Sequence, residues 1–167
     1  TFLWRLNRGK MDKIPMTEDG QKRLIEELKT LKTVERPLIV KAIADARSNG
    51  DLSENAEYHA AREKQSFIEG RVAEIEDIIS KAEIIDVTLL SGSVVKFGAS
   101  VTIINLEDKK ESKYQLVGEF EADIESKKIS VTSPIARALI GKKKGDYIEV
   151  STPRGITSYE IKSVRFK

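Results

Sequence analysis

The sequence has no cysteine and a single histidine among its 167 residues. The absence of cysteine excludes disulfides, thiolate zinc sites and catalytic cysteines, and one histidine cannot form a histidine cluster. A metal ion bound by this chain would therefore be held by oxygen ligands. Aromatic residues make up only 6% of the chain, and the 29 Lys and Arg residues nearly balance the 27 Asp and Glu residues. The chain is therefore not a polycation that binds DNA by charge alone.

Long apolar runs are also missing. No stretch approaches the roughly 20 apolar residues that are needed to cross a bilayer, and residues 1–14 lack the apolar core and the cleavage site of a signal peptide. We therefore expect a cytoplasmic protein without a membrane partner. Because Met11 and Met16 are both possible natural starts, we interpret residues 1–14 as a leader or an upstream extension without a function.

The composition of the chain changes near residue 83. Residues 15–82 are rich in Glu, Lys, Leu, Ile and Ala, which favours helix. Residues 83–167 consist of short β-branched runs separated by Gly, Ser and Pro, which favours strands. A helical part followed by such a part predicts the α+β class with two domains. The predicted strands cover residues 83–88, 100–105, 114–117, 128–132, 147–150 and 159–162.

Residues 15–82 predict two long helices. The first begins at Thr17, a good N-cap residue, and runs to about Ser48, with a bend at Pro37 that does not end it. The second starts after Gly50. Each helix has a seam of apolar residues at steps of three, four or seven. The first seam is Leu24, Leu28, Leu31, Leu38 and Ala42, and the second is Ile68, Val72, Ile75, Ile79 and Ala82.

Two such seams joined by a short turn predict an antiparallel coiled-coil hairpin. At roughly 1.5 Å per residue, its arm would be about 45 Å long. Its turn concentrates acidic side chains, and Asp51 and Glu54 have the spacing of a capping box. One interpretation is that both acids only cap the second helix. The other is that they supply ligands for Mg²⁺, which proteins often hold with one or two carboxylates plus substrate phosphates, so that a second molecule would complete the site.

The run from Ala46 to Ala61, Ala-Arg-Ser-Asn-Gly-Asp-Leu-Ser-Glu-Asn-Ala-Glu-Tyr-His-Ala-Ala, closely resembles the hairpin turn of bacterial GreA-type transcription elongation factors. The resemblance extends over residues 15–166. It is also carried by three further motifs, which are Pro15-Met-Thr17, Arg36-Pro37 and Ser133-Pro-Ile-Ala-Arg-Ala-Leu-Ile-Gly141.

This resemblance implies a coiled-coil hairpin at residues 15–82 followed by an FKBP-like α+β domain at residues 83–167 that binds RNA polymerase. It further implies a monomeric factor that rescues backtracked or arrested polymerase. In that activity, the hairpin enters the secondary channel and stimulates cleavage of the nascent RNA 3′ end by the polymerase active site. The chain itself would then not be an enzyme.

The resemblance also implies roles for single residues. The two acids of the family's tip correspond to Asp51 and Glu54, which would help to hold a Mg²⁺ ion that is shared with the polymerase, so the chain alone would bind no cofactor. Arg47 and Arg62 correspond to basic positions near the RNA.

Several of these residues have a plainer interpretation. Arg47 and Arg62 could simply be solvated residues on the flank of the coiled coil. Ser53 is expected to support the tip or to serve only as a hydroxyl at a helix start. Tyr58 could stack on a nucleotide or pack at the end of the hairpin.

Two other functions are compatible with the implied architecture. An FKBP-like domain could be a prolyl isomerase, but residues 83–167 contain no tryptophan and few aromatic residues to line the pocket of such an enzyme. A polymerase inhibitor of the same shape could occupy the channel without promoting cleavage. Such an inhibitor would not need acids with the spacing of Asp51 and Glu54, so the sequence favours the cleavage factor.

Overall fold

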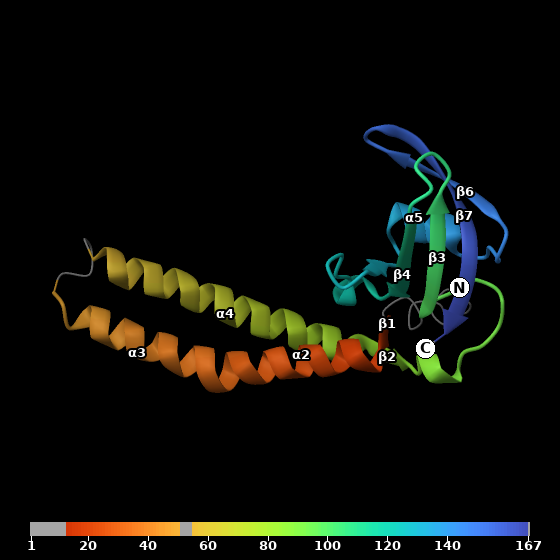
Figure 1. The fold of residues 1–167 in the computed structure, drawn as a ribbon. Coiled ribbons are helices and arrows are strands. Elements are labelled where there is room, and N and C mark those ends of the chain that lie inside the picture. The colour runs from red at the N-terminus through yellow and green to blue at the C-terminus, as the bar shows by residue number, and fades with distance from the viewer. Residues whose placement is uncertain (1–12, 51–54, 167) are drawn as a thin grey trace, which may run out of the picture. The chain divides into compact units, whose positions relative to one another are not determined.

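The computed structural model describes residues 13–50 and 55–166, which belong to two compact units (Figure 1). The first unit contains Gln21–Ala82 and is a helical hairpin. The second contains Ile14–Gly20 together with the chain from Glu83 onward, and is built on a five-stranded sheet. The α+β class predicted from the sequence is confirmed. Among these residues, no helix is both long and apolar enough to cross a membrane.

The first arm of the hairpin is one continuous helical run. It consists of α2 (Glu18–Thr30), a π-helical segment (Leu31–Glu35) and α3 (Arg36–Arg47), and the returning arm is α4 (Ala56–Lys81). Thr17 caps α2 as predicted, because its hydroxyl accepts a hydrogen bond from the N–H of Gly20 at 3.1 Å. The predicted start of the second helix, directly after Gly50, falls on residues 51–54, which lie outside the described residues. The described helix α4 begins at Ala56, because Asn55 has an extended backbone and supplies the cap.

Pro37 shifts the face that the first arm presents to α4. Proline has no N–H to donate within the helix, and the turn just before it is π-helical, with the N–H of Arg36 bonded to the carbonyl of Leu31. A π-helical turn closes over five residues instead of four. The extra residue moves the next seam position from seven to eight residues after Leu31, which is Ile39 instead of Leu38.

The burial of the side chains follows this shift. Ile39 is 5% exposed and packs with Ile43, Ala61, Ile68 and Val72 in the core of the hairpin. Leu38 is 60% exposed, and Ala42 is exposed as well. The prediction that these two residues belong to the seam is therefore wrong.

The seam of α4 differs from its prediction at one step. Ile68, Val72 and Ile75 are buried as expected, but the next buried residue is Ile78, and Ile79 is only half-buried. Steps of three and four residues both fit a helical period of 3.6, so only the packing decides between these two isoleucines.

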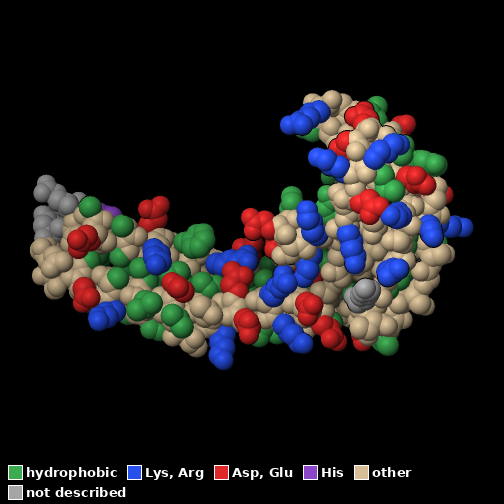
Figure 2. Space-filling view, viewed as in Figure 1, with side chains coloured by type: hydrophobic (Ala, Val, Ile, Leu, Met, Phe, Trp, Pro, Cys, Tyr) green, Lys and Arg blue, Asp and Glu red, His purple; other side chains and the backbone are tan. Residues whose placement is uncertain are grey.

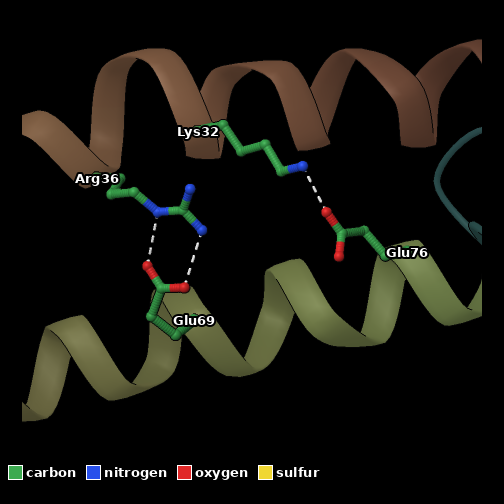
Figure 3. A network of polar contacts seen from close by, with 4 residues as sticks. All are labelled: Lys32, Arg36, Glu69 and Glu76. Carbon is green, nitrogen blue, oxygen red and sulfur yellow. Dashed lines mark hydrogen bonds and ion pairs between the residues drawn. The ribbon is translucent and has the colours of Figure 1, made fainter.

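Ion pairs connect the two arms along their exposed flanks. Figure 2 shows acidic and basic side chains next to one another over the hairpin. Arg36 donates two hydrogen bonds to Glu69, at 2.7 and 2.8 Å, and Lys32 pairs with Glu76 (Figure 3). Arg71 makes a second two-point contact of this kind, donating hydrogen bonds to Glu27 at 2.6 and 2.9 Å. These contacts help to set how the arms are aligned.

We expect Glu69→Gln to lower the melting temperature of the hairpin slightly at neutral pH and to leave it unchanged in strong acid. The hydrogen bonds from Arg36 lower the pKa of Glu69. A lowered pKa stabilises the folded state above the unfolded-state pKa, and this stabilisation is lost as the pH falls through the folded-state value. Because the side chains of Arg36 and Glu69 are 37% and 47% exposed, solvent screens the pair and the effect is small. Thermal unfolding followed by far-UV circular dichroism measures it.

Glu63→Gln is the matched control for this measurement, because Glu63 is an exposed acid on α4 without an ion pair among the described residues. It should change the melting temperature at neither pH. A destabilisation by Glu69→Gln that persisted in strong acid would contradict the electrostatic explanation.

The second unit contains two sheets. The larger has the strand order β5-β4-β3-β7-β6, in which only β4 and β5 are parallel, and the smaller pairs β1 with β2. All six predicted strands are present with shifted ends, and β1 was not predicted. The strands are β1 (Ile14–Thr17), β2 (Ala82–Ile85), β3 (Ala99–Asn105), β4 (Glu111–Val117), β5 (Lys128–Ser130), β6 (Tyr147–Thr152) and β7 (Gly155–Phe166).

The short helix α5 (Pro134–Leu139) packs on one face of the larger sheet. Its N-cap is Ser133, whose hydroxyl accepts a hydrogen bond from the N–H of Ala136 at 3.3 Å. Gly141 follows the helix with a φ of 87°, a conformation that favours glycine. Proline at the first helical position and glycine after the last are favoured at the two ends of a helix, so this local sequence accounts for the bounds of α5. Its residues complete a core with Val95, Ala99, Val101, Ile103, Leu116, Ile129, Ile148, Val150 and Ile161.

A buried acid holds the start of α2 in the second unit. The carboxylate of Glu121 accepts a hydrogen bond from the N–H of Thr17 at 2.7 Å and another from the Thr17 hydroxyl. A Cβ atom on Gly20 would lie 2.4 Å from the Glu121 side chain, so only glycine fits beside this acid. Residues 14–20 therefore fold together with a segment that lies about a hundred residues further along the chain.

Candidate site at the turn of the hairpin

Asn55 closes the turn between the two arms of the hairpin. Its side-chain nitrogen donates a hydrogen bond to the carbonyl of Ala46, in the last turn of α3, at 2.7 Å. Its side-chain oxygen accepts a hydrogen bond from the N–H of Tyr58, in the first turn of α4, at 3.1 Å. A single amide thus joins the end of one arm to the start of the other.

The role of Asn55 was not predicted from the sequence, where the spacing of Asp51 and Glu54 suggested a cap for the second helix as one interpretation. The signal that could have identified Asn55 is local, because asparagine is one of the preferred N-cap residues and here it directly precedes a helix-forming run.

Asp51, Ser53 and Glu54 lie outside the described residues, so their roles stay predictions. The residues on either side of this segment, Gly50 and Asn55, both lie at the closed end of the hairpin.

Arg47 and Tyr58 contact each other across the turn. Arg47 is the last residue of α3, and its guanidinium carbon lies 5.9 Å from the centre of the Tyr58 ring, a cation–π distance. Tyr58 is half-buried against the core of the hairpin. Its ring also meets the ring of His59 edge-on, with the centroids 5.5 Å apart. Tyr58 therefore packs at the end of the hairpin and positions Arg47 there.

Arg62 lies one turn further along α4 than Tyr58. It is exposed, and it donates a hydrogen bond to the side chain of Gln65 at 3.1 Å. Within the described part of the chain, neither Arg62 nor Arg47 is paired with a carboxylate. Both charges are therefore available to an anion that approaches the end of the hairpin.

The described residues contain no group of three or more Asp, Glu, His or Cys side chains that could hold a metal ion. The carboxylates of Asp51 and Glu54 are hard oxygen donors of the kind that Mg²⁺ prefers, so their chemistry fits this ion. Two carboxylates are nevertheless fewer than the octahedral set that Mg²⁺ requires. They suit a site that is shared with another molecule.

Comparison with known proteins gives a consistent result over both units. Residues 14–84 match the family described as "Transcription elongation factor, N-terminal", and residues 90–166 match "Transcription elongation factor, GreA/GreB, C-term". The chain is 60% identical over 156 residues to the transcription elongation factor GreA of Phenylobacterium zucineum and 64% identical over 156 residues to that of Cereibacter sphaeroides. Each alignment covers 93% of this chain and 99% of the relative.

A solved structure is similar as well. The crystal structure of GreA factor homolog 1 of Thermus thermophilus is 26% identical in sequence, and the alignment covers 92% of this chain and 99% of that one with a TM-score of 0.42.

Proposed function

The chain belongs to the GreA/GreB family of transcription elongation factors, and from this premise we propose that it rescues backtracked or arrested RNA polymerase in the bacterial cytoplasm. In this proposal the hairpin enters the secondary channel of the polymerase and stimulates cleavage of the RNA 3′ end. The observation that carries the proposal is the hairpin itself, whose closed end joins Arg47 to Ala56 through the segment that contains Asp51 and Glu54.

The dimensions of the hairpin suit insertion into a channel. α4 has 26 residues and is therefore about 39 Å long. Its core is a single seam between two helices, so the arm is only about two helix diameters wide, roughly 20 to 24 Å. Such an arm is long but encloses too little volume for a catalytic pocket of its own. In this proposal, the catalytic centre is therefore that of the polymerase.

Asp51 and Glu54 would hold Mg²⁺ only together with ligands from the polymerase. The chemistry that Mg²⁺ would supply there is charge stabilisation and activation of a water molecule. The chain contributes the two carboxylates and the means to present them. Asn55 ties together the arms on either side of this segment, so the carboxylates are carried by a closed turn and not by two separating helices.

We assign docking on the polymerase to the sheet unit, because the hairpin has to remain free for insertion. We further propose that the chain acts as a monomer. One factor per polymerase is enough to supply the two carboxylates.

A transcript-cleavage assay tests the proposed function. A stalled elongation complex that carries 3′-labelled RNA is incubated with Mg²⁺, with or without the factor, and release of the 3′ fragment is followed. We expect the factor to accelerate this release. Equal rates with and without the factor, under conditions in which it binds the polymerase, would contradict the proposal.

Charge reversal of Arg47 and Arg62 should weaken contact with the extruded RNA. We expect the double variant Arg47→Glu/Arg62→Glu to lower crosslinking from the RNA 3′ end and to lower cleavage of deeply backtracked complexes about tenfold. In a confined channel, an attraction to phosphate is replaced by a repulsion that water screens poorly. Crosslinking at matched occupancy of the polymerase measures the effect.

Lys22→Glu/Lys29→Glu is the matched control, because both lysines are exposed on the part of the first arm that lies far from the turn and the change in net charge is the same. This control should keep the crosslinking of the unmodified chain. Equal losses in the two double variants would mean that Arg47 and Arg62 are only solvated flank residues.

A further inference from the structure

The face of the larger sheet that lies away from α5 carries a cationic hollow. We call it the outer-face hollow and define it by Lys113, Lys144, Lys162 and Arg165 together with the hydroxyls of Thr102 and Ser163. Its volume is about 520 Å³, and all of these residues belong to the second unit. Figure 2 shows Lys and Arg side chains over the part of this unit where Figure 1 draws β3, β4 and β7.

The strand register brings these side chains together. Thr102 on β3 lies opposite Lys113 on β4 on one side and opposite Ser163 on β7 on the other. Two residues earlier on β3, Ser100 lies opposite Arg165. Residues two apart on a strand share a face, so three neighbouring strands contribute hydroxyls and cations to the same outer surface.

A β-bulge adds Lys162 to this surface. Val101 pairs with Val164 and Ile103 pairs with Ile161, so β7 has one residue more than β3 between these two pairs. Ile161 is fully buried in the core and Val164 packs against it. If the side chains of β7 alternated regularly between the two faces of the sheet, either Lys162 or Ser163 would lie on the inner face, which packs against the core. With the bulge, both Lys162 and Ser163 line the outer-face hollow.

The positive charge of the hollow is largely uncompensated. Glu111 is the acid that lines it, and its carboxylate pairs with Lys162. Over the residues that the structure describes, Lys113, Lys144 and Arg165 have no carboxylate within ion-pair distance, and the hydroxyls of Thr102 and Ser163 have no hydrogen-bond partner. Three cations and two hydroxyls are therefore available to a ligand.

We propose that the outer-face hollow binds the phosphodiester backbone of a single nucleic-acid strand. Lys, Arg, Ser and Thr side chains are the groups that contact phosphate oxygens in protein–nucleic acid complexes. β4 and β7 are separated by one strand, so the cations span about 10 Å across the sheet, and Lys162 and Arg165 lie about 10 Å apart along it. This spread fits more than one phosphate of a strand and exceeds the size of a single phosphate ion.

The lining of the hollow also indicates which partners it does not suit. It contains no aromatic or aliphatic side chain among the described residues. Protein–protein interfaces depend on buried apolar anchors, and stacking of bases requires aromatic faces. Binding here should therefore be independent of base sequence and strongly dependent on salt.

Fluorescence anisotropy with labelled oligo(dT) and the full chain tests the proposal. We expect Lys113→Glu/Arg165→Glu to weaken binding at least about tenfold at low salt and to reduce the slope of log affinity against log salt by roughly 1.4, the value for two lost phosphate contacts. Arg137→Glu/Lys142→Glu changes the net charge equally at exposed positions outside the hollow, so it should keep the affinity within about twofold.

A variant that is expected to bind more tightly separates the role of the hollow from effects on folding, because misfolding would weaken binding. Glu111→Gln removes the partner of Lys162 and should tighten binding by roughly two- to fivefold, the range expected for an exposed ion pair. Four results would overturn the proposal: no binding by the unmodified chain, equal losses in both double variants, poly(Glu) competing as well as the strand, or inorganic phosphate competing as well per phosphate. The third would indicate an acidic protein surface and the fourth a single-anion site.

Discussion

Replacement of Asp51 or Glu54 by alanine is expected to lower factor-stimulated RNA cleavage by on the order of 100-fold, because each change removes one of only two carboxylates that the factor can offer to Mg²⁺. Binding to the polymerase should change by less than about twofold, since a single carboxylate adds little to an interface. Cleavage rates at saturating factor, together with a binding assay, separate the two effects.

The fold of these variants should be preserved, which makes the result interpretable. The cap of α4 is supplied by Asn55, and the same side chain links α4 to Ala46. Neither contact involves the substituted residues, so far-UV circular dichroism should be unchanged.

Glu57→Ala is the matched control for the tip variants. Glu57 is an exposed acid in the first turn of α4, close to the same end of the hairpin. Its replacement should leave cleavage within about twofold of the unmodified chain. A loss as large as that of Glu54→Ala would mean that the general negative charge of this end matters and not the pair. Full activity of both tip variants would contradict their role as metal ligands.

Ile39→Ala should destabilise the hairpin by about 2–5 kcal/mol, whereas Leu38→Ala should change its stability by less than about 0.5 kcal/mol. Ile39 is buried among Ile43, Ala61, Ile68 and Val72, so its truncation leaves a cavity. Leu38 is its direct neighbour in sequence, but 60% of it is exposed. Urea unfolding followed by far-UV circular dichroism measures the difference.

Leu38→Ala serves as the internal control, because it removes a side chain of the same size from the same helix. The regular seam read from the sequence predicts the opposite order of effects. A larger loss for Leu38→Ala would show that the arm follows the regular spacing and that the π-helical turn before Pro37 does not set the packing in solution.

Much of the candidate site could be predicted from the sequence, and the limits have physical reasons. The two arms, the turn between them and the positions of Arg47, Tyr58 and Arg62 follow from helical periodicity and from a long, specific motif. The closure by Asn55 was missed, because two possible caps compete within five residues and only the contact with Ala46 distinguishes them. The roles of Asp51 and Glu54 rest on the resemblance, since carboxylate spacing alone also fits a helix cap.

The sequence by itself determined the features that depend on neighbouring residues. Thr17 and Ser133 cap helices, Gly141 follows one, and the β-branched runs form strands, because capping, backbone preference and side-chain alternation act over a few residues. These interactions are present in any chain with the same local sequence. They identified the α+β class and the order of the two long helices and of strands β2 to β7 before any long-range contact was known.

Only the tertiary structure decided the features that depend on distant residues. The one-residue shift to Ile39 is visible only against the facing residues of α4. The buried Glu121 meets Thr17 across a separation of 104 residues. The bulge that turns Lys162 outward exists only as a mismatch between β7 and β3. In each case the stabilising free energy comes from packing or hydrogen bonding between segments that meet only when the chain folds. A local sequence pattern therefore cannot predict it.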